Sequence, residues 1–138
     1  MGVGPNYVTR KGFLVQGTVA YVTGEIATIV GDGLINRATT LNDQMAFGVT
    51  MEDMTAVRLV AAPNKIAINV ALEGIVRVTA GAAITLGDRV TNNAVALAVT
   101  RTKAIAGAQP LPILGIALEA ASAAGVQIDV LLTPGGTY

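Results

Sequence analysis

Side chains that commonly carry out catalysis are scarce in this sequence, which contains no His and no Cys. A Ser-His-Asp triad, a Cys-His pair and a thiolate zinc site therefore cannot be built, and Ser122 has no general base in its local sequence. Carboxylates remain as candidates, because glycoside hydrolysis needs a pair of acids. The chain offers Glu52, Asp53, Glu73 and Glu119 for such a pair.

Two of these acids have a simpler interpretation. Glu52 and Glu119 lie just past apolar segments in matching positions, which is typical of a solvated carboxylate or one that caps backbone amides. A phosphate loop is not indicated, since residues 31–36 (GDGLIN) lack the third glycine of G-x-G-x-x-G, and no D-x-D-x-D-G calcium loop occurs. We therefore expect a protein that is not an enzyme, with no catalytic residue, no cofactor and no metal.

Several glycines and aspartates are expected to have structural roles in turns. Gly31-Asp32 and Gly87-Asp88 are interpreted as corners in which glycine adopts a positive φ and the aspartate accepts a hydrogen bond from its own turn. Gly48 and Gly115 lie inside apolar segments, where a corner or a close-packed strand crossing would exclude larger side chains.

Strand patterns run through most of the chain. Asp32-Gly33 between apolar runs predicts a hairpin, and residues 66–71 alternate in a way that can continue past Gly74 to residue 79. Residues 118–125 (LEAASAAG) are expected to form a strand end and a turn rather than a helix. Other strands are predicted at residues 18–22, 25–30, 34–38, 46–52 and 57–61. The predicted fold is all-β, a small antiparallel β-barrel or β-tulip sandwich.

The composition favours one domain that associates with itself. A chain of 138 residues fits a single core. Only 13% of its residues are charged and 52% are hydrophobic, against about 25% charged in ordinary soluble domains. Too little charge is available to cover an isolated globule, so we expect a homo-oligomer.

Membranes and nucleic acids are not expected partners. The longest clean apolar run, residues 94–99, has the length of a strand and is far short of the roughly 20 residues of a spanning helix. The first residues lack the apolar centre of a signal peptide, so we expect synthesis in a cytoplasm. The net charge is zero and aromatic residues are only 4% of the chain, which provides neither a basic field nor a stacking platform.

Residues 1–17 differ from the rest and are predicted to form an extended N-terminal arm, with a single β domain at residues 18–138. The segment is rich in glycine and has no sustained period. An ordinary frayed terminus is the alternative. The segment nevertheless carries apolar residues that could anchor it, including Tyr7, Val8 and Phe13, next to its two charges, Arg10 and Lys11.

Residues 18–61 and 75–132 resemble each other and are interpreted as a possible internal repeat. Gly31-Asp32 followed by Gly48 parallels Gly87-Asp88 followed by Gly115. The second copy would carry an insertion at residues 104–112, a Gly- and Pro-containing loop. The alternative is that two strands of one small barrel use the same corner chemistry.

A family resemblance rests on the second half of the chain. The segment ITLGDRV at residues 84–90, followed by PLPILGIALEAASAAGVQIDVLL at residues 110–132, resembles the small phage head decoration (cement) proteins with a β-tulip or β-barrel core, including the DUF2190-type family. The match covers the last half of the chain well and the first half loosely.

The resemblance implies a structural virion protein. Such a protein would bind the outer surface of an icosahedral phage capsid as a homotrimer and stabilise the capsid by bridging subunits of the major capsid protein. The arm would add an edge strand to a capsid subunit, with contacts from Tyr7, Val8, Arg10, Lys11 and Phe13. The alternative is a non-catalytic ligand- or carbohydrate-binding β-barrel module, which would usually present aromatic platforms, and this chain has no Trp.

Overall fold

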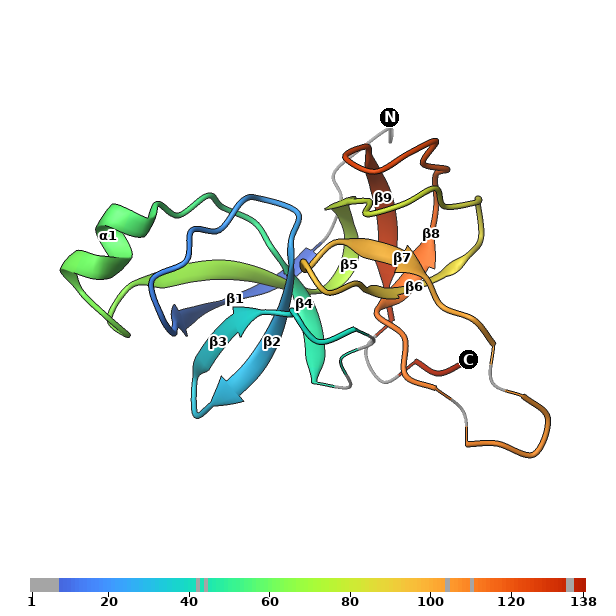
Figure 1. The fold of residues 1–138 in the computed structure, drawn as a ribbon, viewed down its shortest axis with the longest axis horizontal. Coiled ribbons are helices and arrows are strands. Elements are labelled where there is room, and N and C mark those ends of the chain that lie inside the picture. Colours follow the sequence, from blue (N-terminus) through green and yellow to red (C-terminus); the bar gives the residue numbers. More distant parts are fainter. Residues whose placement is uncertain (1–7, 42, 44, 104, 110, 134–135) are drawn as a thin grey trace.

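The computed structural model of the chain describes residues 8–41, 43, 45–103, 105–109, 111–133 and 136–138. In these residues the chain forms nine strands and one short helix (Figure 1). The all-β prediction is confirmed. The elements are β1 (Val8–Val15), β2 (Ile26–Gly31), β3 (Leu34–Arg37), β4 (Ala46–Thr50), α1 (Ala56–Ala61), β5 (Ala67–Thr79), β6 (Arg89–Asn92), β7 (Ala98–Thr100), β8 (Gly115–Ala117) and β9 (Gln127–Leu132).

The first half of the chain closes into a barrel, which we call the N-terminal barrel. Its strands follow the order β1-β3-β2-β4-β5, and β1 also pairs with the first half of β5 to complete the ring. The hairpin predicted at Asp32-Gly33 joins β2 to β3, and Gly33 has a φ of 68° there. The core of this barrel is built around Tyr21, Ile35 and Leu59.

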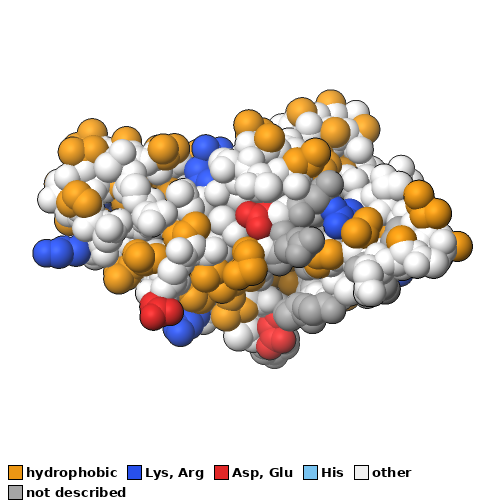
Figure 2. Space-filling model, turned by 60° about the horizontal axis from the view of Figure 1, so that its bottom comes forward, with side chains coloured by type: hydrophobic (Ala, Val, Ile, Leu, Met, Phe, Trp, Pro, Cys, Tyr) orange, Lys and Arg blue, Asp and Glu red, His pale blue; other side chains and the backbone are white. Residues whose placement is uncertain are grey.

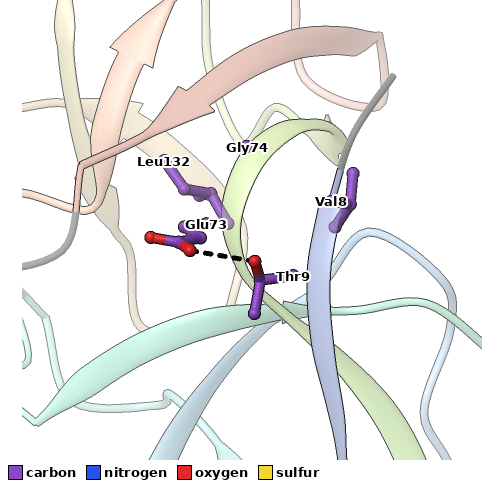
Figure 3. A pocket seen from close by; sticks show the side chains of 5 residues that line it. All are labelled: Val8, Thr9, Glu73, Gly74 and Leu132. Carbon is purple, nitrogen blue, oxygen red and sulfur yellow. Dashed lines mark hydrogen bonds between the residues drawn. The ribbon is translucent and has the colours of Figure 1, made fainter. Parts of the chain in front are cut away.

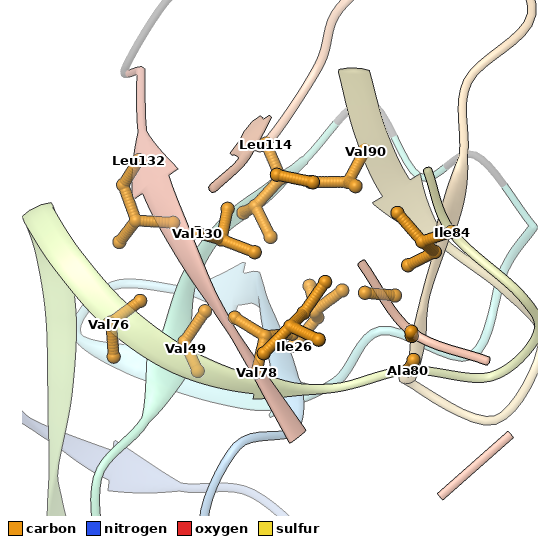
Figure 4. Packing of buried hydrophobic residues seen from close by; sticks show 14 of the residues in the cluster. Ile26, Val49, Val76, Val78, Ala80, Ile84, Val90, Leu114, Val130 and Leu132 are labelled. Atoms are coloured by element: carbon orange, nitrogen blue, oxygen red, sulfur yellow. The ribbon is translucent and has the colours of Figure 1, made fainter. Parts of the chain in front are cut away.

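The second half of β5 continues the same nine-stranded sheet into a second curved unit, which we call the C-terminal barrel. Its strand order is β5-β9-β8-β6-β7, and a parallel bridge between Ala80 and Ala98 brings β7 back to the end of β5. Figure 1 shows β5 running from one lobe into the other. The change of lobe occurs at Gly74, whose φ is 100°. Figure 4 shows the aliphatic core around Val78, Val90 and Val130 of this barrel, which continues to Ile26 of β2 and Val49 of β4 in the N-terminal barrel.

The two barrels share one strand plan and one register. Ala27 pairs with Gly48 in the N-terminal barrel, and Val90 pairs with Gly115 in the C-terminal barrel. The same correspondence holds at the other ladders. Thr28–Asn36 matches Thr91–Val99, Thr50–Val70 matches Ala117–Val130, and Phe13–Ile68 matches Val78–Ile128.

This correspondence changes the boundaries and one landmark of the predicted repeat. The N-terminal barrel also uses β1 and the first half of β5, which lie outside residues 18–61. The counterpart of Gly87 is Gly24 rather than Gly31, because Gly24 and Gly87 have φ values of 92° and 87°, whereas Gly31 pairs with Leu34 inside β2. The dipeptide Gly-Asp therefore occurs in two different settings.

The predicted arm does not hold for residues 8–15, because they form β1 in the wall of the N-terminal barrel. β1 pairs with β5 from Val8 to Leu14 and with β3 at Leu14 and Val15. Val15 is fully buried, so its apolar side chain contributes to the core. Residues 1–7 of the predicted arm, with Tyr7, lie outside the described residues.

The strand predicted at residues 57–61 is wrong, since this segment forms the helix α1. Thr55 caps the helix, and its hydroxyl accepts a hydrogen bond from the backbone amide of Arg58 at 3.4 Å. Leu59 is buried in the core, whereas Val57 and Val60 are exposed. One buried side chain per turn suits a helix that covers the end of a barrel. The predicted strand at residues 18–22 is reduced to a single bridge between Tyr21 and Met54.

Candidate interaction surfaces

The acids considered as catalytic candidates are engaged with the backbone or with neighbouring side chains. Glu52 Oε1 accepts the amide of Asn69 at 2.5 Å, and Glu119 Oε1 accepts the amide of Asp129 at 3.0 Å. These are the backbone-capping roles expected from the matching positions of the two glutamates. Glu119 also forms an exposed ion pair with Arg77 at 2.6 Å.

Of the other two acids, Asp53 joins two loops and Glu73 of β5 binds β1. Asp53 Oδ1 accepts the amide of Thr23 at 2.7 Å and its hydroxyl at 3.0 Å, which hold the pKa of Asp53 below its usual value. Glu73 Oε1 accepts the hydroxyl of Thr9 at 2.9 Å. Within the described residues, no three His, Cys, Asp or Glu side chains gather in a way that could hold a metal ion. No described helix is long and apolar enough to cross a membrane.

An acidic corner recurs in both barrels. Glu25 Oε1 accepts the amide of Val22 at 2.7 Å, and Asp88 Oδ2 accepts the amide of Thr85 at 2.9 Å. Each acid also contacts the next strand at equivalent positions: Glu25 forms a buried ion pair with Arg37, and Asp88 accepts the hydroxyl of Thr100 at 2.8 Å. Asp32, by contrast, is exposed at the tip of the β2–β3 hairpin.

Gly48 and Gly115 are the points of closest strand approach in the two barrels. A Cβ on Gly48 would overlap the carbonyl oxygen of Ala71, and one on Gly115 would overlap that of Leu131. Neither glycine has a positive φ. The constraint on these residues is therefore space between strands rather than backbone conformation.

The two barrels are joined by backbone hydrogen bonds from a corner of the N-terminal barrel to the C-terminal barrel, and the sequence did not indicate this contact. The amide of Thr79 donates to the carbonyl of Gly24 at 3.1 Å, and the amide of Ile26 donates to the carbonyl of Ala96 at 2.8 Å. The corner at residues 24–26 thus bridges the seam of the C-terminal barrel between β5 and the β6–β7 turn. Ala96 is fully buried with a φ of 63°, a conformation that its counterpart Gly33 adopts more readily.

Asn92 strengthens the same junction. Its fully buried amide group donates to the carbonyls of Ala38 at 2.9 Å and Thr40 at 2.7 Å, and its Oδ1 accepts the amide of Asp43 at 2.9 Å. These contacts connect β6 to the loop that leads into β4. A buried amide that satisfies several backbone groups is costly to replace, so the two barrels are held in one arrangement.

The residues predicted to contact a partner lie on or near the outer edge of β1. Arg10 and Lys11 are exposed, while Val8 and Phe13 are half-buried. Phe13 packs edge-on against Phe47 with ring centroids 5.1 Å apart, and Lys11 lies over the ring of Phe13. The described structure thus brings four of the five predicted residues together on one strand.

The outer edge of β1 has backbone groups that no described strand pairs with. The amide of Leu14 donates to the carbonyl of Gly33 on β3 at 3.0 Å, so it points away from β5. Because backbone groups alternate along a strand, those of Gly12 and Arg10 point the same way. β3 pairs with β1 only at Leu14 and Val15, so no strand in the described part of the chain pairs with this edge at Gly12 and Arg10.

A hollow lies where β1 begins. Figure 3 shows it between β1 and the middle of β5, with the Thr9–Glu73 hydrogen bond at its side and Leu132 of β9 across from Val8. Its volume is about 490 Å³. The lining is mixed, with the apolar side chains of Val8 and Leu132 beside the polar ones of Thr9 and Glu73. This shape suits a polypeptide segment better than an enclosed small molecule.

A second exposed surface is apolar. It is formed by Ile29 and Val30 of β2 and by Met45 before β4, with Leu41 nearby. Figure 2 brings the lower side of Figure 1 forward and shows hydrophobic side chains gathered there. A shallow hollow of about 270 Å³ borders Ile29, Val30 and Met45. The alternating pattern of residues 25–30 predicted a strand but could not show that this end of it is uncovered.

Comparisons with known proteins address the fold. No protein-family model matches the chain, and no curated protein matches it. Among solved structures, the chain is similar to the head fiber gp8.5 N base in bacteriophage phi29, with a TM-score of 0.60 and 19% sequence identity. The match covers 91% of this chain and 95% of that chain. The chain therefore has the fold of that head fiber base.

Proposed function

We propose that this protein is a non-enzymatic structural component of a bacteriophage virion. It binds the outer surface of an icosahedral capsid and stabilises the capsid by bridging major capsid protein subunits. The observation that carries the proposal is the fold likeness to a head fiber base along nearly the whole of both chains. The sequence resemblance to head decoration proteins, which rests on residues 84–90 and 110–132, supports the same role.

The outer edge of β1 is the proposed capsid contact. Its backbone groups at Arg10 and Gly12 can pair with an extended capsid segment, a mode in which main-chain hydrogen bonds supply affinity. Arg10 and Lys11 then meet acidic groups of the capsid. The neighbouring hollow accommodates side chains of the added segment, with Val8 on its wall.

Self-association into a homotrimer is proposed to use the apolar surface of Ile29, Val30 and Met45. Exposed apolar clusters rimmed by polar residues mark protein–protein contacts, and here Arg37 and Asp43 line the adjoining hollow. Light scattering of the purified protein should report a multiple of the 14.0 kDa chain mass. A monodisperse monomer at micromolar concentration would contradict the trimer but not the capsid contact.

Purified heads that lack the protein provide the functional test. The wild-type chain should bind them and raise the temperature at which they disrupt. The variant R10E/K11E should bind at least tenfold more weakly, while R58E/K65E, which changes two exposed charges at α1, should bind normally. If the wild-type chain neither binds nor stabilises such heads, the proposed function is wrong. If both variants bind equally well, the β1 edge is not the contact.

A further inference from the structure

Three basic residues meet on the C-terminal barrel, far along the chain from β1. The amide of Arg101 donates to the carbonyl of Arg89 at 2.7 Å, which extends the β6–β7 ladder by one pair and places the two arginines opposite each other. The guanidinium carbon of Arg89 lies 5.3 Å from the centre of the Tyr138 ring, and Lys103 Nζ lies 5.8 Å from the same centre. The ring of Tyr138 therefore contacts two cations, Arg89 and Lys103, and Arg101 is paired with the first of them across the ladder.

No Asp or Glu among the described residues forms an ion pair with the cluster. The ion pairs among the described residues involve Arg37 and Arg77 only, and the residues outside the described part include no Asp or Glu. Asp88, the acid next to Arg89, keeps its charge, and its Oδ2 accepts the amide of Thr85 and the hydroxyl of Thr100 instead of a guanidinium hydrogen. Like charges opposite each other on paired strands are destabilising, so the cluster needs a reason outside the barrel itself.

Arg101 is a buried cation with no acidic partner among the described residues, and burying an unpaired charge costs free energy. It is only 6% exposed, and its Nε is buried without a hydrogen-bond partner among the described residues. Removal from water lowers the pKa of Arg101. A buried charge is screened less by salt and solvent than an exposed one. It therefore adds to the positive potential in front of Arg89 and Lys103, both of which reach solvent.

We propose that Arg89, Lys103 and the buried Arg101 behind them form a second docking site, which binds an acidic segment of the protein shell. The proposal rests on the proposed function for the identity of that shell. A protein carboxylate fits better than nucleic acid, because the chain has zero net charge and the cluster is confined to one spot. Arg89 Nη1 donates to the carbonyl of Gly87 at 3.1 Å, which fixes the guanidinium beside the Tyr138 ring, and its remaining N–H groups can donate to a carboxylate.

A short glutamate peptide labelled with a fluorophore is the probe, titrated against the full chain at low salt. The wild type should bind it measurably, and R89Q/K103Q should bind at least tenfold more weakly. The matched control R58Q/K65Q, which removes two exposed charges from the N-terminal barrel, should bind within twofold of wild type. Circular dichroism melts verify that each variant is folded.

A third variant covers the case in which R89Q/K103Q does not fold. R101M removes the buried charge and keeps an unbranched apolar side chain in its place, so it should melt no lower than wild type and bind the peptide at least threefold more weakly. Equal losses in R89Q/K103Q and the control, unchanged binding in folded variants, or tighter binding of a DNA duplex than of the peptide would each overturn the proposal.

Head binding separates this proposal from the proposed function. If wild-type protein binds heads and folded R89Q/K103Q binds them equally well, the acidic docking site is wrong while the structural role stands. If the wild type does not bind heads at all, the structural role fails. The peptide titration still decides whether the basic cluster recognises carboxylates.

Discussion

The N-terminal and C-terminal barrels follow the same strand order and register but close their seams differently. In the N-terminal barrel, the amide of Leu14 donates directly to the carbonyl of Gly33, within one barrel. At the equivalent place in the C-terminal barrel, Thr79 and Ala96 bond instead to Gly24 and Ile26 of the other barrel. The second barrel is therefore completed by the first.

Two barrels with the same topology can therefore differ in whether their seams close without help from the other barrel. Of the paired positions, some keep one role in both barrels, such as Gly48 and Gly115, and some diverge, such as Ile29 and Asn92. The divergent positions lie at the junction or on exposed faces. We infer that the shared positions maintain the barrel and that the divergent ones set how the barrels attach to each other and to partners.

The largest loss of stability is expected at Gly48 and Gly115, where neighbouring strands leave no room for a side chain. G48V and G115V would drive a side chain into the carbonyl of Ala71 or Leu131, and a backbone group of a paired strand cannot move aside. Each substitution should lower the free energy of unfolding by about 3 kcal/mol, the upper end for overpacking. Urea denaturation measures the loss.

Gly12 provides the control for this pair, because nothing lies within 4 Å of a Cβ built there. G12V should change the stability by less than about 0.5 kcal/mol, as for other exposed positions. A stable G115V beside an unstable G48V would show that the two barrels do not pack alike at this position.

Removing the partner of the acid should cost more stability at the Glu25 corner than at the Asp88 corner. R37A leaves the buried carboxylate of Glu25 without its cation and should cost about 2 to 3 kcal/mol, somewhat less than a fully buried pair because Arg37 is partly exposed. T100A removes only a neutral partner of Asp88 and should cost about 1 kcal/mol. Thermal melts at neutral pH compare them.

In the E25Q background, R37A should cost clearly less, since no charge is then stranded. Equal costs of R37A in the two backgrounds would mean that the ion pair does not distinguish the barrels and that Arg37 acts through packing and its hydrogen bond to the carbonyl of Val95.

Asn92 tests the junction. N92A deprives the carbonyls of Ala38 and Thr40 and the amide of Asp43 of their partner, which should cost about 2 kcal/mol. The counterpart substitution I29N, at a side chain that is 41% exposed, should cost less than about 1 kcal/mol. Hydrogen exchange of the β6 amides is the second measurement, and protection that survives in N92A would argue against a locking role.

The smallest expected effect is a loss of stability at alkaline pH that depends on Tyr21. The equivalent position in the C-terminal barrel is Ile84, which cannot ionise. Burial raises the pKa of Tyr21 to about 12, and its hydroxyl donates to Asn36 Oδ1 at 3.2 Å. The unfolded chain ionises near pH 10, so this contribution is complete below pH 10 and is lost as the pH rises toward 12. Wild type should lose about 1 kcal/mol more than Y21F between pH 9 and pH 11.

Urea midpoints at the two pH values measure this difference, and lysine titration cancels because both chains share it. If Y21F loses as much as wild type, the buried hydroxyl does not report on the N-terminal barrel.

The sequence was most informative where one local rule decides the structure. Asp32-Gly33 predicted the β2–β3 hairpin because a tight reversal needs a residue with positive φ. The alternation from residue 66 predicted β5 and its continuation past Gly74. The all-β class followed from the same patterns.

The sequence was least informative where distant segments decide. Residues 8–15 have no clear period, and they become a strand because β5 offers them a long partner. At residues 57–61 the cap at Thr55 and the single buried Leu59 prevailed over β-branched valines. The junction at residues 24–26 and the partners of Asn92 join segments far apart in the chain, so no spacing indicates them.

Gly74 lies at the meeting point of three strands, and this has a mechanical consequence. The start of β1 and the end of β9 pair with it from opposite sides, through Val8 and Leu132. A tension applied between these two residues would load one hydrogen bond at a time, as in opening a zipper, instead of shearing a whole ladder. A tether attached at either point would also emerge at the waist of the molecule, leaving the far ends of both barrels free.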